Sequence, residues 1–118
     1  MTSCPLAPQI PVFFINPDEI PGNHFQNSHA FAVFGEGVPE PFMVIDESLL
    51  EQDWFTDDHL LVLMAHELGH ILCKTVDEEL ADLVGMQLLL EAEETSAYEL
   101  HLAEYKHRLA NGHYKRAA

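Results

Sequence analysis

The N-terminal part of the chain alternates between short apolar runs and turn-forming residues. Three runs have the composition of β-strands, at residues 11–15, 28–35 and 41–50. Residues 1–10 are punctuated by prolines and predict irregular structure, and the Pro-, Asn- and Asp-rich residues 16–27 predict a loop. A glycine-containing connection joins the second and third runs, which is typical of a hairpin. The pattern therefore predicts a small antiparallel sheet.

The longest apolar stretch, "LVLMAHELGHIL", lies in a predicted helix at residues 59–73. Just before it come Thr56, Asp57 and Asp58, whose side chains commonly cap helix N-termini. A shorter helical piece is predicted near Ser48, where the third strand ends. The helix at residues 59–73 is the best-defined element of the sequence because both its apolar pattern and its start signal agree.

Two further helices are predicted downstream, at residues 76–93 and 96–110. Thr75 and Glu78 match the T-x-x-E pattern of a capping box at the start of the first of them. Strands followed by helices predict an α+β fold, with a small antiparallel N-terminal sheet, a motif-bearing helix, a glutamate-bearing helix and a C-terminal helix. At 118 residues the chain is expected to form a single domain, residues 1–118.

The formal net charge of −15 narrows the range of partners. Binding to nucleic acid or to an anionic membrane surface requires a basic face, so neither partner is expected. Four of the five basic residues lie near the C-terminus: Lys106, Arg108, Lys115 and Arg116. This asymmetry also suggests that residues 106–118 fold over an acidic cleft and hold the protein in a latent form.

The sequence predicts a cytoplasmic protein without a membrane span. No apolar run approaches the roughly 20 residues that cross a bilayer. The first residues, "MTSCPLAPQIP", lack the basic start and apolar run of a signal peptide. Cys4 and Cys73 are the two cysteines, too few for a disulfide framework. No pattern in the chain indicates an oligomeric state.

Two histidines and a glutamate interrupt the apolar helix at "HELGH", residues 66–70. Side chains four residues apart share a helix face, so His66 and His70 can direct two imidazoles at one metal ion. Glu67 lies about a hundred degrees round the helix from His66, where it can take the proton of a metal-activated water without binding the metal. This is the mechanism behind the H-E-x-x-H signature. The alternative is that both histidines are ordinary helix residues.

A catalytic zinc needs a third protein ligand and one open position. The segment "DEELAD", residues 77–82, offers Glu78 as that ligand, with Asp77 and Glu79 as rivals. Asp82 lies four residues after Glu78, on the same helix face, where it can accept a hydrogen bond from the outer nitrogen of a metal-bound histidine. The alternatives are that Glu78 only completes the capping box and that Asp82 is a solvated charge.

Together these motifs resemble the gluzincin metallopeptidases. In that family a helix bearing H-E-x-x-H is followed by a helix bearing E-x-x-A-D, as in "HELGH" and "EELAD" here. The upstream segment "HAFAVFGEGVPEPFMVIDESLLEQ" is similar to the catalytic core of the CAAX prenyl protease and heat-shock membrane peptidase branch. The size of the chain resembles the minigluzincins, which are reduced versions of that core. The resemblance covers about residues 28–90.

The resemblance implies a complete set of site residues. One zinc ion would be bound by His66, His70 and Glu78, with Glu67 as general base and acid. An extended peptide or protein substrate would pair with the strand formed by Ala30, Phe31, Ala32, Val33 and Phe34.

The sequence departs from the family pattern at three points. His29 stands where the family has asparagine, the spacing from His70 to Glu78 is short, and the family's downstream histidine has no clear match. That histidine helps to stabilise the developing oxyanion. Three residues of the last predicted helix could supply such a donor: Tyr98, His101 and Tyr105.

The sequence thus predicts a zinc-dependent endopeptidase, either active or latent. One alternative is a non-catalytic zinc-binding domain that regulates or binds other proteins on the same scaffold. Another is a protease restricted to one repressor-like partner, which shares the chemistry but does not cleave general substrates.

Overall fold

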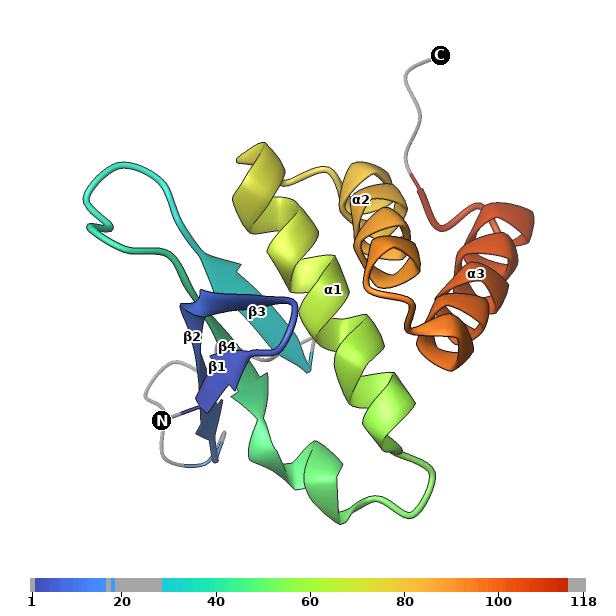
Figure 1. The fold of residues 1–118 in the computed structure, drawn as a ribbon, viewed down its shortest axis with the longest axis horizontal. Coiled ribbons are helices and arrows are strands. Elements are labelled where there is room, and N and C mark those ends of the chain that lie inside the picture. The colour runs from blue at the N-terminus through green and yellow to red at the C-terminus, as the bar shows by residue number, and fades with distance from the viewer. Residues whose placement is uncertain (1, 17, 19–28, 115–118) are drawn as a thin grey trace.

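The computed structural model describes residues 2–16, 18 and 29–114. Within them a small sheet is followed by three helices, which confirms the predicted α+β arrangement (Figure 1). The predicted loop at residues 16–27 falls almost wholly outside the described residues. In chain order the elements are β1 (Thr2–Cys4), β2 (Ala7–Ile15), β3 (Ala30–Val33), β4 (Phe42–Asp46), the 3₁₀-helix η2 (Glu47–Glu51), α1 (Asp57–Cys73), α2 (Glu78–Glu91) and α3 (Thr95–Ala110).

The sheet has four strands in the order β1-β2-β4-β3. The predicted hairpin is confirmed, because β3 and β4 pair antiparallel, and β1 and β2 also pair antiparallel. The expectation of a purely antiparallel sheet is wrong, since β2 runs parallel to β4. The reason is topological. The hairpin leaves the other edge of β4 open to β2, and the long connection after β2 lets the chain return before β3 begins.

The prediction of irregular structure at residues 1–10 is also wrong. The prolines there do not break the strands: Pro11 pairs with Ser3 across the β1–β2 ribbon, and the register shifts between Ser3 and Cys4. Such an irregularity accommodates residues that a regular ladder would exclude. Burial of Ile10 and Val12 in the core fixes which face of β2 points inward.

Helix α1 lies between the sheet on one side and α2 and α3 on the other (Figure 1). Its N-terminus is fixed by the expected capping residue, Thr56, which forms a reciprocal capping box with His59. The apolar face of α1 packs on the sheet in one hydrophobic core. From α1 this core takes Met64, Leu68 and Ile71, and from the sheet Cys4, Ala7, Ile10, Val12, Ala30, Met43 and Ile45.

The predicted capping box of Thr75 and Glu78 is wrong. Asp77 is the N-cap of α2, because its side chain accepts a hydrogen bond from the backbone of Leu80 at 3.1 Å. The Thr75 hydroxyl instead accepts from the backbone of Asp77 at 3.0 Å. Glu78 is therefore the first helical residue, and its side chain has no capping role.

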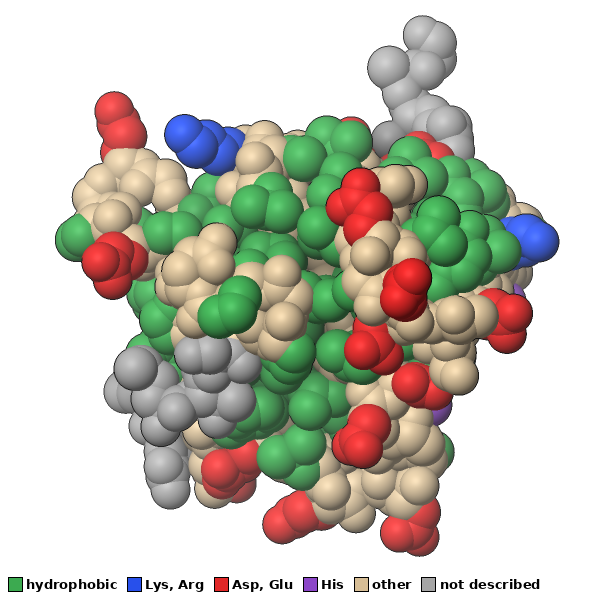
Figure 2. All heavy atoms as spheres, viewed as in Figure 1, with side chains coloured by type: hydrophobic (Ala, Val, Ile, Leu, Met, Phe, Trp, Pro, Cys, Tyr) green, Lys and Arg blue, Asp and Glu red, His purple; other side chains and the backbone are tan. Residues whose placement is uncertain are grey.

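The surface of the described residues carries mainly acidic charge. On the face in Figure 2, carboxylate side chains are spread over the helices and the hairpin, whereas Lys and Arg are sparse. Among the described residues, no helix is both long and apolar enough to cross a membrane. Lys115 and Arg116, which carry part of the predicted latency contact, lie outside the described residues.

Candidate metal centre

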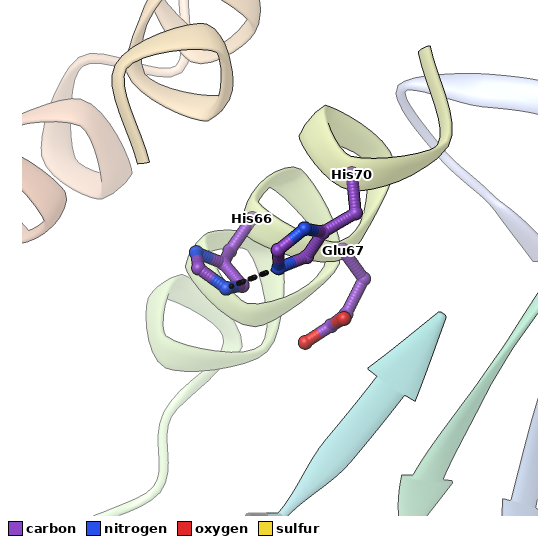
Figure 3. Close-up of side chains that lie close together, drawn as sticks. All are labelled: His66, Glu67 and His70. Carbon is purple, nitrogen blue, oxygen red and sulfur yellow. Dashed lines mark hydrogen bonds between the residues drawn. The ribbon is translucent and has the colours of Figure 1, made fainter. Parts of the chain in front are cut away.

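His66 and His70 lie one turn apart on α1, and their rings meet edge to face at 4.7 Å between centroids. Their Nε2 atoms are 3.1 Å apart (Figure 3). His70 is buried and His66 is partly buried. The i, i+4 spacing of the motif therefore brings two ring nitrogens to one point, as the sequence predicted.

The N-terminus of α2 brings a carboxylate to the same point. The Glu78 oxygens lie 3.0 Å from Nε2 of His66 and 3.0 Å from Nε2 of His70. The two rival ligands are engaged elsewhere: Asp77 caps α2, and Glu79 accepts a hydrogen bond from the Tyr105 hydroxyl at 2.8 Å. Glu78 is the carboxylate that meets both histidines.

Gly69 explains how so short a connection brings Glu78 into place. A Cβ atom at this position would lie 2.5 Å from the backbone oxygen of Ala81 and 3.0 Å from its Cα. Only a residue without a side chain allows α2 to pack so close to α1. The connection between α1 and α2 is therefore short. It runs from Lys74, which has the left-handed conformation with φ of 48°, to Asp77.

The outer nitrogens of both rings face hydrogen-bond acceptors. His66 Nδ1 lies 2.7 Å from Oδ1 of Asp82, and His70 Nδ1 lies 2.8 Å from the backbone oxygen of Thr75. A carboxylate or a carbonyl oxygen can only accept, so each Nδ1 must donate a hydrogen. In the neutral rings both Nε2 lone pairs then point at each other and at the carboxylate of Glu78.

This donor set fits a cation. Three acceptors converge, and without a positive charge between them they would repel one another. Two nitrogens bound to one tetrahedral zinc at about 2.0–2.1 Å are separated by about 3.3 Å, close to the 3.1 Å between the Nε2 atoms. Two imidazoles and a carboxylate are also one of the ligand sets that catalytic zinc takes together with an open position.

The acid–base properties of the cluster have the same cause. Burial lowers the pKa of His66, but hydrogen bonds to Asp82 and Glu78 outweigh it and raise that pKa to about 10. The bonds from His66 and His70 lower the pKa of Glu78 to about 2. Without metal, protons on the imidazoles supply the positive charge that the carboxylates require. A bound metal must displace those protons.

Glu67 lies beside the cluster formed by His66, His70 and Glu78. Its side chain is buried, with 5% exposed, and it turns from α1 toward β3 (Figure 3). One carboxylate oxygen lies within 4.8 Å of a ring nitrogen of each histidine. Burial raises the pKa of Glu67, although the two histidines oppose the shift. The carboxyl group is thus close to the candidate metal position and has an increased affinity for a proton.

A cavity of about 590 Å³ opens onto the cluster. One wall comes from the segment predicted to hold substrate: Ala30, Phe31, Ala32 and Phe34 line the cavity, whereas Val33 does not. Another wall carries Trp54, Phe55 and His59, whose rings contact one another at the start of α1. The cavity is large enough for several residues of a peptide.

The three residues predicted as oxyanion donors occupy different surroundings. His101 borders the cavity and is fully buried, with Nε2 3.0 Å from Oδ1 of Asp82. Tyr105 donates to Glu79, and Tyr98 packs in a second apolar cluster between α1, α2 and α3. Tyr98 and Tyr105 are not among the described residues that line the cavity.

Two further side chains reach the site, and both belong to the segment at residues 106–118 that was predicted to fold over an acidic cleft. Arg108 lies 3.0 Å from both oxygens of Asp82, and the Tyr114 hydroxyl donates to Oδ2 of the same carboxylate. Arg108 follows His101 by seven residues, so both lie on the same face of α3. This spacing, together with the scarcity of basic residues, was the available signal for Arg108. Tyr114 follows α3 and belongs to no sequence motif that would have predicted its contact with Asp82.

No protein-family model, no curated protein and no solved structure matches this chain.

Proposed function

We propose that this chain is a zinc-dependent peptidase of the gluzincin type. One observation carries the proposal: the Nε2 atoms of His66 and His70 and the carboxylate of Glu78 converge on one point, and Asp82 and Thr75 accept from each Nδ1, so that the neutral rings present three acceptors there. Such a cluster is most stable around a cation. The position of Glu67 beside it adds the group that hydrolysis requires.

A zinc ion held by these three residues would supply Lewis-acid polarisation of a peptide carbonyl and would lower the pKa of water. Glu67 receives the proton of the attacking water and then delivers it to the leaving amine nitrogen. Its raised pKa suits both steps, because a carboxylate with an ordinary pKa is a weaker base. His66, His70 and Glu78 hold their positions throughout.

The substrate is a peptide or protein segment. Four side chains of the segment from Ala30 to Phe34 line the same cavity as His66 and Glu67, which supports an extended peptide lying along β3. The acidic surface in Figure 2 supports a partner other than nucleic acid. We also propose that the protein acts in the cytoplasm, since Cys4 and Cys73 are both free thiols.

A second candidate function is a non-catalytic zinc-binding domain. The observation that favours it is the contact between the metal ligands and the rest of the fold: Asp82 links His66 to α3, so metal binding would also stabilise the helices. Both functions require the same three ligands. They differ only in whether Glu67 takes part in a reaction.

The metal content of the purified protein is the first test. We expect about one zinc per chain when the protein is purified without chelator and measured by elemental analysis against protein concentration. Glu78→Ala should lose this zinc, because two imidazoles alone leave the site one ligand short. Glu79→Ala is the matched control: it removes the neighbouring carboxylate, which contacts Tyr105 rather than the histidines. A wild-type protein that takes up no added zinc would contradict both candidate functions.

A further inference from the structure

The carboxylate of Asp82 joins three parts of the chain. It is 1% exposed and accepts hydrogen bonds from His66 of α1, from His101 and Arg108 of α3, and from Tyr114. Oδ1 meets His66 at 2.7 Å and His101 at 3.0 Å, so one oxygen receives both imidazoles. Burial opposes ionisation, but these hydrogen bonds hold the pKa of Asp82 well below its usual range. Asp82 is therefore a carboxylate that only accepts.

His101 is an unusual residue for its position. It is fully buried, and its Nε2 must donate to Asp82, because the carboxylate cannot. Its other ring nitrogen, Nδ1, has no hydrogen-bond partner among the residues that the structure describes. A buried polar atom without a partner destabilises the fold, and an apolar side chain of similar size would avoid that cost. The compensating benefit of histidine must lie in the Nε2 hydrogen that it gives to Asp82.

The chain also makes room for this ring. A Cβ atom at Gly85 would lie 2.9 Å from Cε1 of His101 and 3.0 Å from the backbone of Ala65. Gly85 thus lets α2 pack against α1 while His101 passes beside it to reach Asp82. Gly85 therefore supplies the space in which His101 donates a hydrogen bond to Asp82.

We propose that His101 is a positioning residue for the metal centre. By donating from Nε2 to Oδ1 of Asp82, it holds that oxygen where it accepts from Nδ1 of His66, so that the Nε2 lone pair of His66 points at the metal. The proposal rests on the zinc site proposed above. Outer partners of this kind typically change metal affinity 10–100-fold when they are removed. His101 is fully buried and acts on the metal through Asp82 and His66.

A pair of variants of similar volume tests this role. His101→Gln keeps a side-chain donor, whereas His101→Met keeps the bulk and removes it. We expect zinc affinity, measured by competition with a chelator of known affinity, to fall about 10–100-fold in the Met variant and to be largely restored in the Gln variant. His107→Met, on the exposed side of the same helix, is the control and should bind zinc as the wild type does.

The ring hydrogens provide a readout that a purely structural role would leave unchanged. Long-range ¹H–¹⁵N spectra of the zinc-loaded wild type should show His66 with its hydrogen on Nδ1 and His101 with its hydrogen on Nε2. In the zinc-loaded Met variant, the Nδ1 hydrogen of His66 should exchange faster with water and its ¹⁵N signal should shift, because Oδ1 of Asp82 is held less firmly where it accepts that hydrogen. Wild-type zinc affinity in the Met variant, with unchanged His66 signals, would overturn the proposal.

Two further outcomes are separable. If the Met variant does not fold, the wild-type spectrum decides, because a hydrogen on Nδ1 rather than Nε2 of His101 would leave Asp82 without this donor and would overturn the proposal. If the wild type binds no zinc, the zinc-site proposal fails by metal analysis. The tautomer of His101 can still be read on the metal-free protein, so the two failures are distinguishable.

Discussion

The two sides of α1 differ in the interactions that they make. The side that faces the sheet is mostly apolar, with Met64, Leu68 and Ile71 buried among strand residues. The side that faces α2 carries His66 and His70, whose ring nitrogens all meet polar partners. Burial of apolar area stabilises the first side without strict geometry, whereas the second depends on distances of about 3 Å between named atoms. One face of α1 therefore contributes mainly to stability, and the other face sets the geometry of the site.

Three consecutive residues allow that separation to be tested. Glu67 lies at the site, Leu68 lies in the apolar core, and Gly69 lies at the closest approach of α2. Because the helix turns by about a hundred degrees per residue, each points in a different direction. Changing each residue singly should alter a different property: the rate of reaction, the free energy of unfolding, and the spacing of the helices.

Glu67→Gln should have the largest effect, and it should be on activity. We expect kcat for peptide hydrolysis to fall about 10²–10⁴-fold, because the amide cannot take a proton from water or return it to the amine. Zinc content and unfolding temperature should stay close to those of the wild type, since Glu67 is not one of the three converging ligands. The measurement is cleavage of a mixed peptide library followed by mass spectrometry.

Peptide cleavage by the zinc-loaded wild type distinguishes the two candidate functions, and the Glu67→Gln variant tests the role of Glu67. A zinc-loaded wild type that cleaves no peptide, including candidate repressor-like partners, would favour the non-catalytic domain. An active wild type whose Glu67→Gln variant hydrolyses peptides at the same rate would show that another group handles the proton. Glu79→Gln serves as the control for a change of charge near the site, because its carboxylate contacts Tyr105.

Leu68→Ala should mainly affect stability. Leu68 is fully buried against the sheet, and its truncation should lower the free energy of unfolding by about 2–5 kcal/mol through lost burial and a cavity. Zinc affinity of the folded fraction should change little, because the cavity opens on the side of α1 away from Glu78. Urea denaturation followed by circular dichroism measures the loss. Leu72→Ala, at an exposed position of α1, should cost much less; equal losses would contradict the two-sided description.

The sequence predicted the elements that depend on local patterns. The α1 helix, its Thr56 cap and the β3–β4 hairpin follow from periodicity and turn residues, so all three are confirmed. The i, i+4 spacing also placed His66 and His70 together. What failed depended on packing between distant segments. The strand predicted at residues 11–15 is confirmed as part of β2, but its extension back to Ala7 depends on the burial of Ile10 and on the irregular register of the β1–β2 ribbon, which the local sequence does not encode.

The residues of the site divide in the same way, into those that local spacing predicts and those that depend on contacts between elements. Glu78 and Asp82 were identified as candidates from spacing on one helix, and both meet the histidines. The Thr75–Glu78 capping box was wrong because Asp77, two residues after Thr75, caps α2 by accepting from the backbone of Leu80, while the Thr75 hydroxyl accepts from the backbone of Asp77. Arg108 and Tyr114 reach Asp82 from another helix and from the segment after it. Of these two contacts, only that of Arg108 had a signal in the sequence, its spacing of seven residues from His101, whereas that of Tyr114 had none.

Gly69→Ala should have the smallest effect, and its sign tests how closely α1 and α2 pack. In an unobstructed helix, replacing glycine by alanine stabilises by about 1 kcal/mol. Here the new Cβ would meet the backbone oxygen of Ala81 at 2.5 Å, and backbone cannot rotate away as a side chain can. We therefore expect a net loss of about 1–3 kcal/mol in the free energy of unfolding, measured by urea denaturation. Zinc affinity should fall as well, because Ala81 and Glu78 belong to the same helix and must move together. A variant more stable than the wild type would mean that the two helices do not approach so closely, and the short connection would no longer explain how Glu78 reaches both histidines.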